Sequence, residues 1–156
     1  SPNGFSPLHL AAWNAVLGTN SKQPSTPRLK MIKDLLEAGA NPDAVDSVGR
    51  TPLYLCCLGD PRPIDSAVAL LEAGADPNKR AEDGNSPMNA LCWGNSDSPL
   101  IGYMLVHGAD INAADAEGLT PRVRLTASSR QKDLLALDTA EEMGEMEQPK
   151  NNKPSM

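Results

Sequence analysis

The chain repeats one phrase, Gly-x-Ser/Thr-Pro, four times, at positions 4–7, 49–52, 84–87 and 118–121. The glycines that open it lie 45, 35 and 34 residues apart. A second phrase, Gly-Ala-Asn/Asp, follows three of these after a stretch of helical composition, at positions 39–41, 74–76 and 108–110. Two linked phrases at a nearly constant period predict a repeat array.

The chemistry of the first phrase explains why each unit opens a helix. Its Ser or Thr is a favoured N-cap, and Pro is favoured at the first helical position, where its missing N–H costs nothing. The glycines of both phrases supply positive φ, and the glycine of the second phrase ends a helix. Each unit is therefore predicted to be a helix pair plus a turn.

Three stretches carry a family resemblance: SPLHLAA at 6–12, LLEAGAN at 35–41 and TPL at 51–53. They resemble the ankyrin repeat, whose hallmark is T-P-L-H-x-A on a 33-residue period. The resemblance covers roughly residues 1–140 and implies an all-α solenoid of stacked helix-turn-helix units with short β-turn or hairpin fingers. We expect units near residues 1–45, 46–80, 81–114 and 115–143.

The first two units depart from the period between their helices. Ser6 lies 33 residues before Gly39, whereas the corresponding interval in the second unit is 23 residues. The extra residues fall in 14–28, a polar and proline-punctuated stretch typical of an exposed loop. A tolerated insertion is favoured over a dedicated binding loop, because long surface loops cost little entropy. In the second unit, Pro61 and Pro63 delay the second helix until Ile64.

The last unit departs in its apolar positions. Arg122 and Arg124 stand where earlier units are apolar, so either the helix rotates to bury Val123 and Leu125, or this unit has a wet outer face as a terminal cap. A final helix is expected over 133–143. Residues 144–156 are polar and proline-flanked, and we expect them to form a disordered tail.

Composition limits the partners and the compartment. Aromatic content of 3% suits Leu/Ala-rich helix stacking, and no apolar run reaches membrane-spanning length. With 20 acidic and 14 basic residues, the chain lacks a basic footprint for nucleic acid or anionic membranes. We expect a monomer, cytoplasmic or nuclear, that binds a neutral or basic protein or linear peptide, with no nucleic acid or membrane partner. Since Ser1 opens directly on a repeat, we expect an excised piece of a longer protein.

No catalytic or metal constellation stands out. Cys56, Cys57 and Cys92 lack the paired C-x-x-C spacing and take the places of small helix-contact residues, so reduced, buried thiols are expected. The resemblance implies that His9 is hydrogen-bonded to backbone and to the cap hydroxyl, and His107 precedes a helix-ending glycine. Phosphate loops, serine elbows and carboxylate-pair signatures are missing from the sequence. We therefore predict a protein that is not an enzyme, with no cofactor and no metal.

The resemblance also implies which surface acts, since ankyrin arrays bind proteins along a concave side made of turn tips and first helices. Turn-tip candidates follow each phrase glycine, and helix candidates follow the small-residue pair; together they are Phe5, Trp13, Arg50, Leu58, Asn85, Trp93 and Leu119. These positions hold both tryptophans and the single phenylalanine. Trp is enriched at binding hot spots, but large residues here can also pad the groove, and both interpretations stay open.

Three functions fit these features. The first is a protein-interaction module within a larger adaptor or regulatory protein. The alternative from another class is a structural spacer or an intramolecular cover within a multidomain protein. A less favoured possibility is a methyl-lysine peptide reader built from Phe5, Trp13 and nearby acids.

Overall fold

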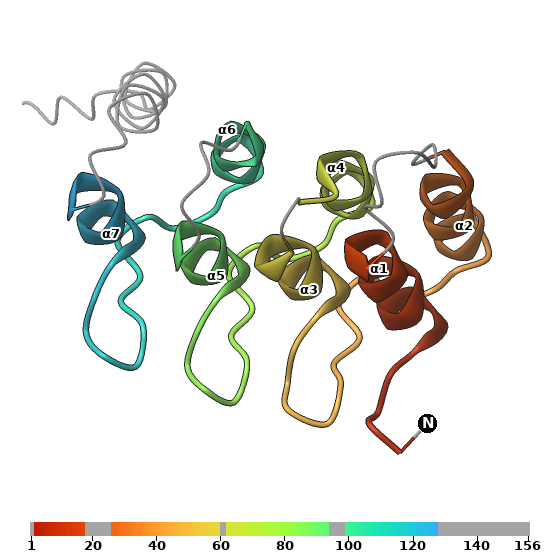
Figure 1. Ribbon diagram of the computed structural model, residues 1–156, viewed down its shortest axis with the longest axis horizontal. Coiled ribbons are helices and arrows are strands. Elements are labelled where there is room, and N and C mark those ends of the chain that lie inside the picture. Colours follow the sequence, from red (N-terminus) through yellow and green to blue (C-terminus); the bar gives the residue numbers. More distant parts are fainter. Residues whose placement is uncertain (1, 18–25, 60–61, 94–98, 128–156) are drawn as a thin grey trace, which may run out of the picture.

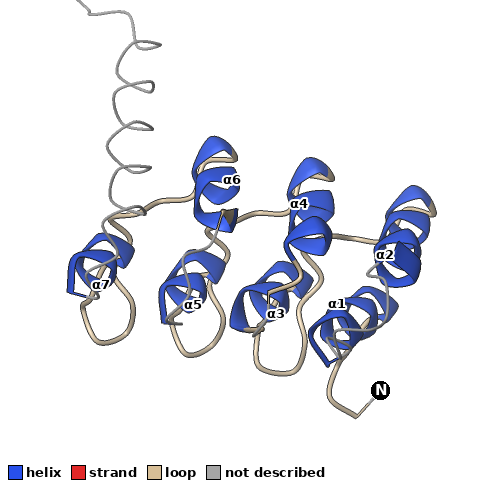
Figure 2. Ribbon diagram, turned by 45° about the horizontal axis from the view of Figure 1, so that its top comes forward, coloured by secondary structure: helices blue, strands red, loops and turns tan. Residues whose placement is uncertain are grey.

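A computed structural model describes residues 2–17, 26–59, 62–93 and 99–127, and in these ranges the helices form two layers (Figure 1). One layer contains α1 (Pro7–Leu17), α3 (Pro52–Leu58), α5 (Pro87–Trp93) and α7 (Pro121–Ala127). The other contains α2 (Thr26–Glu37), α4 (Ile64–Glu72) and α6 (Leu100–Val106). Loops project from the α1/α3/α5/α7 layer, away from the second layer (Figure 2). We call these the inner and outer layers.

The predicted all-α solenoid is confirmed, with one qualification about its loops. Each of the three loops that lead into α3, α5 and α7 is closed by a backbone hydrogen bond between its ends. These bonds join Asp46 N to Arg50 O at 3.0 Å, Ala81 N to Asn85 O at 2.9 Å, and Asp115 N to Leu119 O at 2.9 Å. We name 46–50, 81–85 and 115–119 the second, third and fourth fingers, after the units that they open. The described residues contain no strand, so these fingers are turns rather than hairpins.

The predicted caps begin every inner helix. The hydroxyl oxygens of Ser6, Thr51, Ser86 and Thr120 each accept the backbone N–H three residues ahead, at 3.3, 3.1, 3.2 and 3.2 Å. The predicted positive φ is also present at all seven glycines of the two phrases. Gly49 is favoured for a second reason, because a Cβ at this position would lie 3.0 Å from the backbone nitrogen of Glu82 in the next finger. Glycine therefore permits both the turn and the close stacking of fingers.

The core lies between the two layers and continues from unit to unit. Its fully buried side chains include Leu8, Leu53, Leu70, Leu91, Leu100 and Met104. The three cysteines are buried thiols rather than members of disulfides, as predicted. Burial raises the pKa of the Cys56 thiol to about 12, so this thiol stays neutral at physiological pH.

Arg62 ties two units together beside this core. α4 begins at Ile64, as the prolines predicted, and Arg62 lies just before it. Its Nε donates to the carbonyl of Cys57 at 3.2 Å, and its Nη2 donates to the carbonyl of Leu91 at 3.0 Å. These carbonyls lie near the C-terminal ends of α3 and α5, where helix carbonyls lack partners of their own. One side chain thus caps two neighbouring helices.

The first and last units differ in several places from what the sequence predicted. Residues 14–17 belong to α1 and 26–28 to α2, so helices take both ends of the stretch expected as a loop, and 18–25 lie outside the described residues. In α7, Leu125 is buried but Val123 is 47% exposed, so the rotation that would bury both is wrong. The helix expected over 133–143 and the tail at 144–156 also lie outside the described residues. Among the helices that are described, none has the length and apolar character needed to cross a membrane.

Candidate functional site

A groove of about 500 Å³ lies between the second and third units, on the finger side of the inner layer. Its walls come from two inner helices and two fingers; they are Val48, Arg50, Tyr54, Leu58, Ala81, Glu82, Asp83 and Trp93. Leu58 on α3 and Trp93 on α5 are 38% and 43% exposed, so both present apolar surface to the groove. The groove therefore combines an apolar and aromatic surface with an acidic edge.

Tyr54 joins the two units that form the groove. It follows the cap Thr51 by three residues, the position that His9 holds in the first unit. The His9 ring accepts from the Ser6 cap through Nδ1 and bonds the carbonyl of Arg50 through Nε2 at 2.8 Å, which confirms the role that the resemblance implied. Tyr54 likewise reaches the next finger, where its hydroxyl donates to Asp83 at 3.1 Å. Burial, with the Asp83 charge adding to it, raises the pKa of Tyr54, so the hydroxyl remains a donor.

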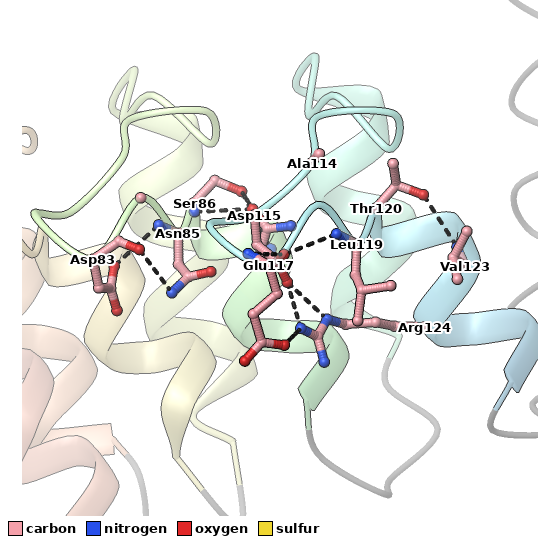
Figure 3. Close-up of polar contacts among 12 residues, drawn as sticks. Asp83, Asn85, Ser86, Ala114, Asp115, Glu117, Leu119, Thr120, Val123 and Arg124 are labelled. Carbon is pink, nitrogen blue, oxygen red and sulfur yellow. Dashed lines mark hydrogen bonds and ion pairs between the residues drawn. The ribbon is translucent and has the colours of Figure 1, made fainter.

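The second and fourth fingers each contain a carboxylate paired with an arginine. Asp46 accepts the backbone N–H groups of Val48 and Arg50 through Oδ1, and it binds Arg50 Nε through Oδ2 at 2.8 Å. Asp115 has the same arrangement in the fourth finger, with Arg124 as its cation (Figure 3). Both carboxylates are buried, so the ion pairs also satisfy groups that water does not reach.

The third finger lacks this arrangement, because Ala81 stands where the others have aspartate. Asp83 accepts the backbone N–H of Asn85 instead, at 3.0 Å, in addition to the Tyr54 hydroxyl. Partial burial opposes ionisation of Asp83, but hydrogen bonds from Asn85 and Tyr54 outweigh it and hold its pKa below the usual range. Within the described residues, no cation pairs with the Asp83 carboxylate.

Asn85 lies beside this carboxylate with an unsatisfied atom. Its side chain is only 6% exposed, and its Oδ1 has no hydrogen-bond partner. Its Nδ2 makes one long bond, 3.5 Å, to the carbonyl of Asp83 (Figure 3). A buried acceptor without a donor costs free energy, so the third finger is less well satisfied than its neighbours.

Trp93 also has a cationic neighbour within the chain. The guanidinium carbon of Arg124 lies 5.8 Å from the centroid of the Trp93 ring, within the range of a cation–π contact. The same guanidinium is held by the carboxylates of Asp115 and Glu117 (Figure 3). The chain therefore holds one arginine against this ring with two acids.

Comparison with family models now adds to this geometry. A family model described as "Ankyrin repeat" matches residues 3–47 and 48–82, which together make up more than half of the chain. The chain belongs to the ankyrin-repeat family. A search of curated proteins found no match. Ankyrin repeats are generally protein-interaction modules.

The groove between the second and third units contains some of the partner-binding residues that were predicted from sequence. Arg50, Leu58 and Trp93 line it. Trp13 is partly buried on α1, and Leu119 is 37% exposed on the fourth finger; neither lines this groove. Their contact with a partner stays a prediction.

The expected turn tips need correction. In each complete finger the phrase glycine donates back across the turn, as Gly49 N does to Asp46 O at 3.1 Å, so Ser47 and Val48 form the tip of the second finger. The residue after the glycine therefore lies on the returning arm.

Phe5, the corresponding residue of the first unit, is partly buried. It stacks on His9 with ring centroids 5.6 Å apart.

Sequence reasoning missed more than half of the groove. Its lining residues Val48, Tyr54, Ala81, Glu82 and Asp83 were not chosen as partner-binding residues. Tyr54 carried a usable signal, because it stands at the His9 position of the repeat. The tip residues became identifiable only once the turn bond had been located.

The described residues were compared with the ligand sets of metal sites. In those ranges no three His, Cys, Asp or Glu side chains gather as metal ligands would. That the chain has no cofactor stays a prediction.

Proposed function

We propose that the groove between the second and third units binds an extended segment of a partner protein, and that the chain acts as the interaction module of a larger adaptor or regulatory protein. One observation carries the proposal: Leu58 and Trp93, both exposed, come from neighbouring units and line one groove. Large apolar groups exposed together in a hollow are typical of binding sites. The general role of ankyrin repeats in protein interaction supports it.

The groove favours a segment of neutral or basic character. Glu82 and Asp83 line it, and its arginine, Arg50, is already paired with Asp46. An acidic segment would meet like charge there. A methyl-lysine cage built on Phe5 has less support, because its ring stacks on His9.

Trp93→Ala tests the proposal in the intact chain. The wild-type chain first serves as bait to identify a partner, and the purified partner is then titrated against variants by calorimetry. Loss of a Trp hot spot costs about 2 kcal/mol, which corresponds to an affinity about 30-fold weaker. Tyr103→Ala is the matched control, since Tyr103 is 47% exposed on the outer helix α6.

The control variant should bind as wild type does. If Trp93→Ala and Leu58→Ala both keep wild-type affinity while the fold is intact, the groove is not the binding surface. A bait that captures no external protein favours the structural spacer or intramolecular cover instead.

A further inference from the structure

The three complete fingers differ in how they balance charge. In the second finger Asp46 has Arg50, and in the fourth Asp115 has Arg124. The third finger has neither member of this pair, because Ala81 stands at the Asp46 position and Asn85 at the Arg50 position. Its acids, Glu82 and Asp83, line the groove without a described cation partner.

The acids of the third finger can accept further hydrogen bonds. Each oxygen of Asp83 accepts one bond, from Tyr54 or from the backbone of Asn85, and a carboxylate oxygen has two acceptor sites. Glu82 is exposed next to it. With Arg50 neutralised by Asp46, the groove presents an uncompensated negative charge to its occupant.

The rings that line the groove suit a planar cation. Tyr54 and Trp93 both contribute to its walls. A guanidinium stacks on aromatic faces and pairs with carboxylates through several N–H groups, whereas an ammonium is a compact and more strongly hydrated charge. Arg124 shows that this chain already combines Trp93, two carboxylates and a guanidinium.

We propose that the bound partner segment supplies an arginine, whose guanidinium pairs with Asp83 and Glu82 and packs against Trp93. The inference rests on the proposed function and names the chemistry of its partner. The arginine of the segment thereby gives the acids of the third finger a cation, as Arg124 does for Asp115 and Glu117 of the fourth.

A peptide titration of the intact ¹⁵N-labelled chain tests this, with acetyl-Gly-Arg-Gly-amide as the probe. Two control peptides carry lysine or glutamate in place of the arginine. We expect the arginine peptide to shift the NMR signals of the Trp93 indole N–H and of the Glu82 and Asp83 amides, and to saturate at a lower concentration than the lysine peptide. The glutamate peptide should shift none of these signals. Equal responses to the arginine and glutamate peptides, or arginine shifts confined to other residues, overturn the proposal.

Two substitutions of one residue give a matched comparison. Asn85→Arg places an arginine of the chain itself beside Asp83 and should weaken binding of the arginine peptide at least tenfold. Asn85→Leu, which copies Leu119 of the fourth finger, adds size without charge and should keep binding within twofold. If the two variants bind the peptide equally, the arginine of the peptide does not pair with the acids of the third finger.

Acid-to-amide changes separate this inference from the function on which it rests. The double variant Glu82→Gln, Asp83→Asn should weaken peptide binding at least tenfold and lose the preference for arginine over lysine. A partner can need Trp93 and yet bind this double variant at wild-type affinity. That result would support binding in the groove and overturn the proposal that the partner supplies an arginine. Helical circular dichroism confirms that each variant is folded.

Discussion

Asp46 is the side chain through which the second finger is most directly tested. It is buried, and it accepts the backbone N–H groups of Val48 at 3.0 Å and Arg50 at 2.8 Å. Its other oxygen accepts from Arg50 Nε at 2.8 Å. Asp46→Ala removes all three bonds and leaves two backbone donors of a tight turn without their acceptor.

The expected cost follows from these contacts. A hydrogen bond to a charged group contributes about 1.5 kcal/mol at the lower end of its range, and two such bonds to the backbone are lost. The ion pair adds about 0.5 kcal/mol, because the Arg50 side chain is 31% exposed and water screens it. We expect Asp46→Ala to lower the free energy of unfolding by about 3.5 kcal/mol.

The effect should depend on pH in a defined direction. Burial opposes ionisation of Asp46, but the hydrogen bonds from Arg50 and Val48 outweigh it and lower its pKa. A lowered pKa in the folded state gives stability that is complete above the unfolded value, about 4, and is lost as pH falls through the folded value. The gap between wild type and variant should therefore narrow below pH 4.

Urea unfolding followed by circular dichroism measures this gap, at pH 7 and at the lowest pH where the wild type stays folded. Ser47→Ala is the control, because Ser47 is an exposed residue of the same turn. A difference in the free energy of unfolding below about 1 kcal/mol at pH 7 would refute the cost assigned to the three lost bonds. A difference that stays unchanged in acid would refute the role of the ionised carboxylate.

Two further predictions concern the core. Arg62→Ala removes the donors to Cys57 and Leu91 carbonyls and should destabilise the array by about 1 kcal/mol in urea unfolding; Arg62→Lys should recover less than half, since one ammonium does not reproduce the fork. Because the pKa of Cys56 is raised in the folded state, the contribution of its neutral thiol to the free energy of unfolding is complete below about pH 9 and is lost as pH rises toward 12. The urea midpoint of unfolding should therefore fall less between pH 8 and pH 10.5 in Cys56→Ala than in the wild type. An equal fall in the two proteins would contradict this.

The local rules of the sequence predicted the scaffold well. The caps at Ser6, Thr51, Ser86 and Thr120 depend on residues three positions apart, so a phrase is enough to identify them. The start of α4 at Ile64 followed from proline alone. Such features depend on backbone conformation within one unit, which explains why they were predictable.

The groove was less predictable because its contacts cross between units. Tyr54 meets Asp83 from 29 residues away, and Arg124 meets Trp93 from the next unit. Neither pairing follows from the repeat pattern, since the other units hold different residues at those places. Asn85 was misplaced for a local reason: the turn bond closes at the glycine, which moves the next residue away from the tip.

The spacing of the groove walls follows from three ties at different depths. The fingers are joined by Glu82 N and Val48 O at 3.0 Å, the inner helix reaches across through Tyr54, and the far ends of α3 and α5 share Arg62. With each depth tied, the second and third units hold a set separation rather than opening like a hinge. A segment bound as proposed would meet walls already held at one separation, so the groove would need little ordering of its own on binding.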